Sequence, residues 1–128
     1  MSTIELTAEN FDASIRDNEI LFVDFWASWC GPCRAFAPTY EAASEAHPDL
    51  SFGSVNTEEQ HQLSSAAGIS SIPTLMVFRE QIIVFSQPGA LPQGSFEQVV
   101  AKAKSLDMDE VRKQIESQSA GDDAQASA

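Results

Sequence analysis

The chain has 128 residues, 43% of them apolar, and carries 19 acidic against 7 basic side chains, for a formal net charge of −12. This length supports one hydrophobic core and is too short for two ordinary domains, so we expect one compact domain. The acidic balance argues against binding to nucleic acid or to an anionic membrane surface, because both need clustered Lys and Arg, and no apolar run reaches the length of a membrane span.

The cysteine count and the N-terminus bear on the compartment of the protein. Two cysteines cannot form the set of disulfide bonds that stabilises small secreted domains. The segment Met1–Leu6 lacks the basic stretch followed by an apolar stretch that begins a secretory signal. We therefore expect a cytoplasmic protein in a reducing environment.

The first quarter of the chain predicts a strand, a helix and a second strand. Ile4–Leu6 is a short strand candidate, and Thr7 is placed to cap a helix that ends near Asp17. Ile20–Trp26 is almost continuously apolar, which is typical of a strand covered on both faces. Asp24 interrupts that run, and a buried carboxylate costs several kcal/mol unless it is paired or protonated. Either Asp24 reaches water at a strand edge, or it exchanges protons with a nearby group.

Cys30 and Cys33 follow this strand, and three interpretations are open for them. As a structural disulfide the pair would close a very short loop and restrict the unfolded chain by only about 2 kcal/mol. As a zinc site it lacks ligands, because there is no second cysteine pair and His47 and His61 lie too far apart for a zinc finger. As a reversible redox pair it needs no further residue, and we expect no bound metal.

The redox interpretation agrees with the local pattern. A helical pattern begins at about Cys33 and ends near Ala46, and its apolar face contains Phe36, Ala37, Tyr40 and Ala43. Cys30 is then at a helix N-terminus, where unpaired backbone N–H groups and the helix dipole lower the pKa of a thiol. Pro32 suits the first helical turn, and Gly31 lets another chain approach closely.

Strands and helices alternate beyond this helix. Ser51–Asn56 is a weak strand, and Glu58–Ala67 is a short helix that Gly68 ends. Ile72-Pro73 leads into the next strand, and the base rate for such a bond favours the trans form.

The following segment predicts a hairpin. Thr74–Arg79 and Ile82–Ser86 are apolar strands, and the turn between them, Glu80-Gln81, lacks the Asn-Gly or Gly that a tight turn prefers. Gln87–Ala90 then returns the chain, and a closing amphipathic helix follows, with an apolar face made of Phe96, Val99, Val100 and Ala103.

The sequence pattern divides the chain into three predicted ranges. Residues 1–105 form the predicted domain, and residues 106–116 form an accessory helix with Leu106, Val111 and Ile115 as its apolar positions. Residues 117–128 are rich in Ser, Ala, Gly and Asp and lack apolar anchors, so we expect them to be disordered.

Across roughly residues 3–105 the sequence closely resembles the thioredoxin family. Five pieces occur in the order and at the approximate spacing of that family: Val23-Asp24-Phe25-Trp26, Trp29-Cys30-Gly31-Pro32-Cys33, Pro38, Ser71-Ile72-Pro73-Thr74 and Gly89-Ala90. A lone Cys-x-x-Cys would be weak support, whereas the five together are strong. The resemblance implies the α/β thioredoxin fold, in which a central mixed β-sheet is flanked by helices on both faces.

The resemblance also implies a function and the residues that perform it. It predicts a protein-disulfide reductase in which Cys30 is the nucleophile, Cys33 resolves the mixed disulfide, and Asp24 takes and returns the proton of Cys33. It implies a cis bond at Ile72-Pro73. A mostly apolar client-binding surface is expected from Trp29, Gly31, Pro32, Ile72, Pro73, Gly89 and Ala90.

Partners follow from the same resemblance. The family is recharged by a flavin-containing, NADPH-dependent thioredoxin reductase, while nothing in this chain resembles a nucleotide or cofactor site of its own. Client proteins with disulfides are the other expected partners, and the apolar surface near Trp29 fits a monomer. The alternatives are a disulfide oxidant or isomerase of the same fold, which often carries histidine between the cysteines, and a binding module or co-chaperone that uses the C-terminal extension.

One position departs from the family. Many thioredoxins carry a lysine near the buried acid, and this chain has Ser54 in its place. Losing a nearby cation removes an interaction that favours the ionised carboxylate, so we expect the pKa of Asp24 to be higher than in relatives that keep the lysine.

Overall fold

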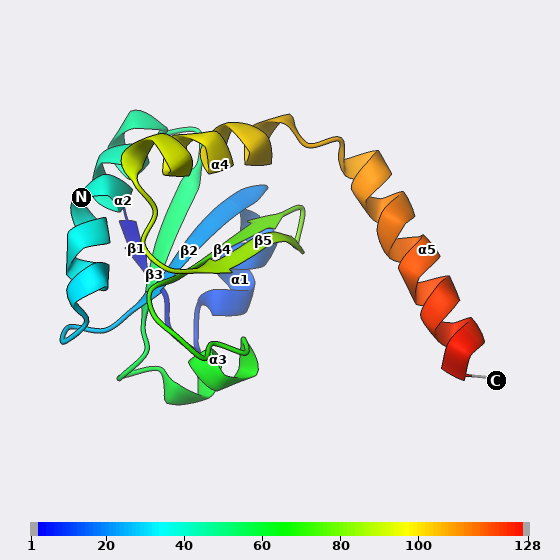
Figure 1. Ribbon diagram of the computed structural model, residues 1–128, viewed down its shortest axis with the longest axis horizontal. Helices are drawn as coiled ribbons and strands as arrows, with labels where there is room; N and C mark the ends of the chain where they lie inside the picture. Colours follow the sequence, from blue (N-terminus) through cyan, green and yellow to red (C-terminus); the bar gives the residue numbers. More distant parts are fainter. Residues whose placement is uncertain (1–2, 127–128) are drawn as a thin grey trace.

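A five-stranded mixed sheet with helices on both faces forms the body of the protein (Figure 1). The computed structural model describes residues 3–126, with side chains as far as residue 118. In chain order the elements are β1 (Thr3–Glu5), α1 (Phe11–Asp17), β2 (Ile20–Trp26), α2 (Gly31–Ala46), β3 (Ser51–Asn56), α3 (His61–Ala66), β4 (Thr74–Arg79), β5 (Ile82–Pro88), α4 (Gln93–Ser105) and α5 (Met108–Ala126). Among the described residues, none of the helices is both long and apolar enough to cross a membrane.

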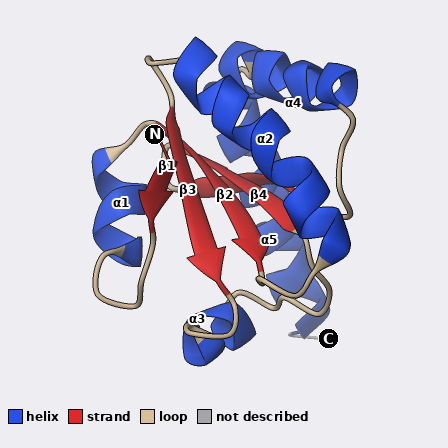
Figure 2. Ribbon diagram, turned by 90° about the vertical axis from the view of Figure 1, so that its left-hand side faces the viewer, coloured by secondary structure: helices blue, strands red, loops and turns tan. Residues whose placement is uncertain are grey.

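The strand order is β1-β3-β2-β4-β5, which places β2 at the centre of the sheet. β3 lies parallel to both β1 and β2, whereas β4 runs antiparallel to β2 and to β5. The predicted thioredoxin architecture, a mixed sheet between helices, is confirmed. Helices α2 and α4 cover one face of the sheet, and α1 and α3 cover the other (Figure 2).

Two apolar clusters fill the space between the sheet and its helices. Alternation along β2 sends Phe22 to the cluster under α2 and α4, where it packs against Phe52 and Phe96. The same alternation sends Val23 and Phe25 to the opposite cluster, under α1 and α3. Because β2 is covered on both faces, its nearly continuous apolar run is explained.

Several element boundaries match the sequence expectations, and others move. β2, β3 and β4 have the predicted bounds, while α2 begins at Gly31, two residues earlier than expected. The expectation that Thr7 caps α1 is wrong. Residues 7–10 form a turn in which Asn10 Oδ1 accepts a hydrogen bond from the Thr7 backbone N at 2.7 Å, and the helix begins only at Phe11.

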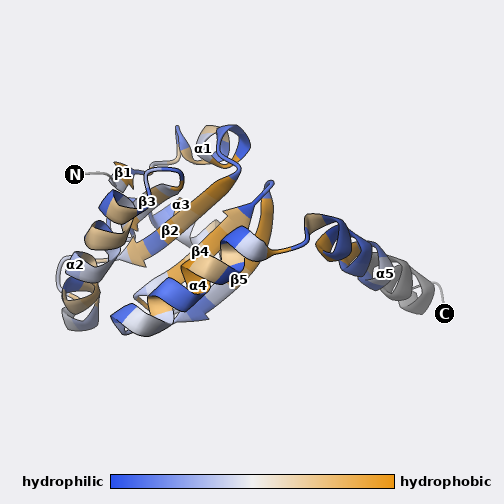
Figure 3. Ribbon diagram, turned by 90° about the horizontal axis from the view of Figure 1, so that it is seen from above, coloured by the Kyte–Doolittle hydropathy of each residue, from blue (hydrophilic) through white to orange (hydrophobic). Residues whose placement is uncertain are grey.

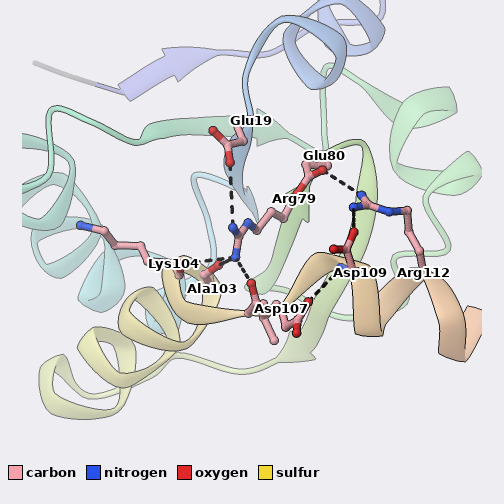
Figure 4. Close-up of polar contacts among 9 residues, drawn as sticks. Glu19, Arg79, Glu80, Ala103, Lys104, Asp107, Asp109 and Arg112 are labelled. Atoms are coloured by element: carbon pink, nitrogen blue, oxygen red, sulfur yellow. Dashed lines mark hydrogen bonds and ion pairs between the residues drawn. The ribbon is translucent and has the colours of Figure 1, made fainter.

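The β4–β5 turn has an unusual backbone. Glu80 and Gln81 both have positive φ, 51° and 70°, which is the conformation of the tight hairpin turn that glycine and asparagine prefer. Next to it, Arg79 reaches the end of α4, where its Nη1 donates to the carbonyl oxygens of Ala103 at 2.9 Å and Leu106 at 2.7 Å (Figure 4). A cation at a helix C-terminus satisfies carbonyls that have no partner inside the helix.

Helix α5 starts beside the same turn and extends away from the sheet (Figure 3). Asp107 caps its first turn by accepting hydrogen bonds from the backbone N of Asp109 and Glu110, at 3.1 and 3.2 Å. Met108 is buried, and Arg112 pairs with Glu80 at 2.8 Å. The helix continues to Ala126, past residue 116 where the sequence analysis expects helix to give way to disorder, and residues 127–128 lie outside the described residues.

Candidate active site around the Cys30–Cys33 pair

Cys30 and Cys33 lie where the central strand passes into α2. A short loop follows β2, and it closes when the Cys30 backbone N donates to the Ala27 carbonyl at 3.2 Å. Cys30 then occupies the N-cap position of α2, and Cys33 lies within the first turn of that helix. The two form a disulfide with their Cα atoms 5.2 Å apart, and both are almost fully buried.

The helix N-terminus favours negative charge on Cys30. The Cys33 backbone N donates to Cys30 Sγ at 3.2 Å, so a donor is already aimed at the sulfur. Pro32, next to the start of the helix, has no N–H to leave unpaired. A donor and the positive end of the helix dipole both stabilise a thiolate relative to a thiol, and thiolate is the form that attacks disulfides.

A second loop lies against the pair. The carbonyl oxygen of Ile72 is 3.8 Å from Cys30 Sγ, and Ile72 packs against the small cluster formed by Ala27, Cys30 and Cys33. The Ile72-Pro73 bond is cis, as the family resemblance implied. The Gly89 backbone N donates to the Pro73 carbonyl at 2.7 Å, with Gly89 at φ 100°, which suits glycine. Tertiary folding thus brings three distant segments together at the disulfide.

The residues expected to contact clients differ in exposure. Trp29 is 67% exposed although it is a large apolar side chain, which is typical of a binding surface. Gly31, Pro32, Gly89 and Ala90 are also exposed. Ile72 is half-buried and Pro73 is buried, so from these two a client would reach mainly the backbone of the loop.

Asp24 lies beneath the pair on the central strand. Its side chain is 5% exposed, and its Oδ1 has no hydrogen-bond partner among the described residues. Burial raises the pKa of Asp24 to about 7. The interpretation of Asp24 as a strand-edge residue is wrong, because β2 is flanked by β3 and β4.

A cavity of about 200 Å³ joins Asp24 to Cys33, and we call it the Asp24 cavity. Its walls come from β1, β2, β3 and α2. They are formed by Thr3, Asp24, Trp26, Cys33, Arg34, Ala37, Tyr40, Glu41 and Ser54. A cavity of this size with several polar groups can hold water, and water can carry a proton between the carboxyl and the thiol.

Ser54 lies beside Asp24 in the sheet. The two are register partners on the parallel strands β2 and β3, and both line the cavity. Residue 54 is the position at which the family resemblance led us to expect a lysine in many relatives. Here it offers a hydroxyl and no charge.

Tyr40 was expected only as an apolar helix position, and the structure places it in the lining of the cavity. Its hydroxyl donates to the Gly53 carbonyl at 2.7 Å. Its pKa is raised well above the usual value by burial and by the negative charge of Asp24. Sequence reasoning missed Thr3, Tyr40 and Glu41 as polar residues of this cavity. The helical spacing of Cys33, Ala37, Tyr40 and Glu41, which places them on one face of α2, could have indicated two of them.

Metal-binding geometry is a separate question. Within the described part of the chain, no group of three or more His, Cys, Asp and Glu side chains is arranged to hold a metal ion.

Comparison with known proteins adds to this geometry. Residues 2–102 match the family described as Thioredoxin. A protein named "Putative thioredoxin 2" from Streptomyces coelicolor is 60% identical over 119 residues, which cover 93% of this chain and 89% of that protein. "Thioredoxin-1" of Saccharomyces cerevisiae is 34% identical over 97 residues, covering 76% of this chain and 94% of the yeast protein.

Solved structures show the same fold. A Plasmodium falciparum thioredoxin superposes with a TM-score of 0.73 at 33% identity, covering 77% of this chain and 97% of that one. A mutant thioredoxin from Halobacterium salinarum reaches a TM-score of 0.77 at 25% identity, covering 83% of this chain and 94% of that one.

The sequence match to the Streptomyces protein extends beyond the family domain. It spans 119 of the 128 residues, so it includes residues 106–116 whatever its first residue is.

Proposed function

Because the chain belongs to the thioredoxin family and is a thiol–disulfide oxidoreductase, we propose that it reduces client proteins by a cycle in which Cys30 attacks and Cys33 resolves. The Cys30 thiolate attacks one sulfur of a client disulfide, forms a mixed disulfide and releases the other client sulfur as a thiolate. Cys33 then attacks Cys30 and releases the second client sulfur. Two electrons pass to the client, and the Cys30–Cys33 disulfide remains.

Asp24 serves the second step in this proposal. Cys33 must lose its proton before it can attack, and Asp24 shares a cavity with it. A base with a pKa of about 7 is well matched to proton transfer near neutral pH. Asp24 therefore accepts the Cys33 proton through water and returns it when the disulfide is reduced again.

Clients bind over the disulfide on the surface formed by Trp29, Gly31, Pro32, Ile72, Pro73, Gly89 and Ala90. The exposure of Trp29 and the nearness of the Ile72 carbonyl to Cys30 Sγ support this assignment. An extended client segment can pair with the backbone at Ile72, in the manner of an added strand.

The remaining assignments concern the wider system. We propose that a flavin-containing, NADPH-dependent thioredoxin reductase recharges the disulfide, and that the protein acts in the cytoplasm as a monomer. Residues 1–105 form the catalytic domain, with residues 106–116 as an accessory helix. The Gly31-Pro32 pair between the cysteines places no charge near the thiolate, so we favour a reductase over an oxidant or isomerase.

The observation that carries the proposal is the placement of Cys30 at the N-cap of α2 with a backbone N–H aimed at its sulfur. Its test begins with the reduction potential of the pair, by equilibration with glutathione or dithiothreitol. Insulin-disulfide reduction coupled to NADPH and a thioredoxin reductase follows. We expect a potential at or below that of the glutathione pool, together with coupled turnover; a clearly more oxidising potential would support the isomerase instead.

The cysteine roles have a separate test. Cys30→Ser should abolish turnover because the nucleophile is absent, and Cys33→Ser should accumulate mixed disulfides that mass spectrometry detects. Normal turnover by Cys33→Ser would contradict the resolving role.

A further inference from the structure

The proposed cycle leaves a proton inside the protein. Each resolving step transfers the Cys33 proton to Asp24, whose side chain is 5% exposed. With a pKa of about 7, Asp24 exchanges this proton with solvent between the two halves of the cycle: it loses the proton after resolution and regains one before it protonates Cys33 again. The Asp24 cavity is the space that connects the carboxyl to other polar groups, and its walls indicate the route.

The inner part of the cavity offers hydroxyl groups. Asp24 Oδ1 has no hydrogen-bond partner among the described residues, so it is able to bind a cavity water. Tyr40 uses its hydroxyl hydrogen on the Gly53 carbonyl, which leaves its oxygen able to accept a hydrogen bond. Ser54, beside Asp24, can both donate and accept. Water in contact with these groups can move a proton away from Asp24.

The cavity lining also includes a second carboxylate, that of Glu41. Glu41 lies on α2, is half-buried and lines the cavity. Thr3 Oγ1, on β1, donates to Glu41 Oε2 at 3.0 Å and so holds this side chain between the first strand and the helix. The cavity lining thus holds one almost fully buried carboxylate, Asp24, and one half-buried carboxylate, Glu41.

We propose that Glu41 is the outer proton acceptor of the resolving reaction, and that it takes from Asp24, through water in the Asp24 cavity, the proton that Cys33 releases. This inference rests on the proposed role of Asp24. The proton passes from Cys33 sulfur to the Asp24 carboxylate, then to the Glu41 carboxylate and finally to solvent, with no change in oxidation state beyond the thiol–disulfide exchange itself.

Arg34 and Glu5 are further charged groups near this route. Arg34 lines the cavity from α2, and its Nη1 donates to the Ser28 carbonyl at 3.3 Å, so it is a fixed cation that cannot accept a proton. Glu5 is the register partner of Ser54 and is the alternative candidate for the outer proton acceptor. However, it is exposed and lines a neighbouring hollow that contains neither Asp24 nor Cys33. Glu41 is therefore the better placed acceptor.

The experiment follows the proton and the leaving group separately. Reduced full-length protein reacts with the disulfide of dithiobis(nitrobenzoate), which places one thionitrobenzoate on Cys30 and releases the other as a first coloured anion. When Cys33 resolves this mixed disulfide, one coloured thionitrobenzoate anion and one proton are released. Stopped-flow absorbance records the anion, and phenol red in unbuffered solution near pH 7.5 records the proton.

In the natural protein the two signals should coincide. In Glu41→Gln the anion should appear at close to the natural rate, whereas the proton should lag about threefold or more behind it. Glu41→Asp and added acetate should each remove the lag, because both restore a carboxylate. The matched control is Glu45→Gln, one turn further along α2 and exposed, which removes the same charge without touching the cavity and should show no lag.

Distinct results would overturn each assignment. Coincident signals in Glu41→Gln, or an equal lag in Glu45→Gln, would refute the role of Glu41. A proton lag in Glu5→Gln without one in Glu41→Gln would mean that Glu5, and not Glu41, is the outer proton acceptor. Asp24→Asn tests the underlying proposal: it should slow release of the anion itself, and an unchanged anion rate would remove Asp24 from the mechanism whatever Glu41 does.

Discussion

Asp24 and Ser54 are register partners on the parallel strands β2 and β3, and both line the cavity that reaches Cys33. A buried acid therefore has a neutral hydroxyl as its neighbour in the sheet. Neighbouring residues in a sheet have side chains on the same face, so a change at residue 54 acts directly on the Asp24 carboxyl.

Ser54→Lys should lower the pKa of Asp24. An opposite charge at this range typically lowers the pKa of a carboxyl by about 1–3, because it stabilises the ionised form. Titration of the Asp24 carboxyl by ¹³C NMR measures the change from the present pKa of about 7. Ser54→Met supplies a long neutral side chain as the control and should not lower the pKa; equal effects of Lys and Met would mean that charge is not the cause.

Asp24→Asn should stabilise the oxidised protein above neutral pH. The pKa of Asp24 is about 7 in the folded state against 3.8 in the reference state, so between these values the folded state binds the extra proton. The contribution of Asp24 to the free energy of unfolding is therefore most favourable below pH 3.8. It falls as the pH rises toward 7, by up to about 4 kcal/mol.

Asparagine removes this pH-dependent cost. Urea unfolding at pH 5 and pH 8 should show that the stability gain of Asp24→Asn is larger at pH 8, by about 2 kcal/mol or more. A gain that is the same at both pH values would contradict the raised pKa.

Gln81→Gly should stabilise the β4–β5 hairpin by about 0.5–1 kcal/mol. Gln81 has φ 70°, a conformation that is unfavourable for residues with a Cβ, and the gain is reduced by the greater freedom of glycine in the unfolded chain. Denaturant midpoints measure the change. Gln98→Gly, at an exposed position within α4, should instead destabilise by about 1 kcal/mol, and a similar loss at residue 81 would show that its backbone is not strained.

Arg112→Gln should loosen α5 while leaving disulfide reduction unchanged. Arg112 bridges Glu80 and Asp109, each at 2.8 Å, and so ties the first turns of α5 to the hairpin (Figure 4). Both ion pairs are partly exposed, so they should contribute only weakly to the stability of the domain. Hydrogen exchange over residues 108–116 should become several-fold faster. Lys113→Gln, on the same helix, is the control, and equal acceleration there would point to net charge as the cause.

The bounds of the central strands could be predicted from sequence. Ile20–Trp26 is a long apolar run, and such a run is recognisable because burial on both faces leaves no polar alternation. Boundaries that depend on one side-chain hydrogen bond were not predictable. Asn10 closes the turn before α1, and the pattern of residues 7–10 does not distinguish it from Thr7 as the cap.

By itself the sequence determined the family, the two cysteines and the acid at position 24, because these lie in contiguous motifs whose chemistry depends on residue type and spacing. Tertiary structure alone decided what surrounds them. Glu41 meets Thr3 across 38 positions of sequence, and Tyr40 on α2 reaches Gly53 on β3. Such contacts depend on how α2 packs against the sheet, and local propensities and spacing carry no information about that packing.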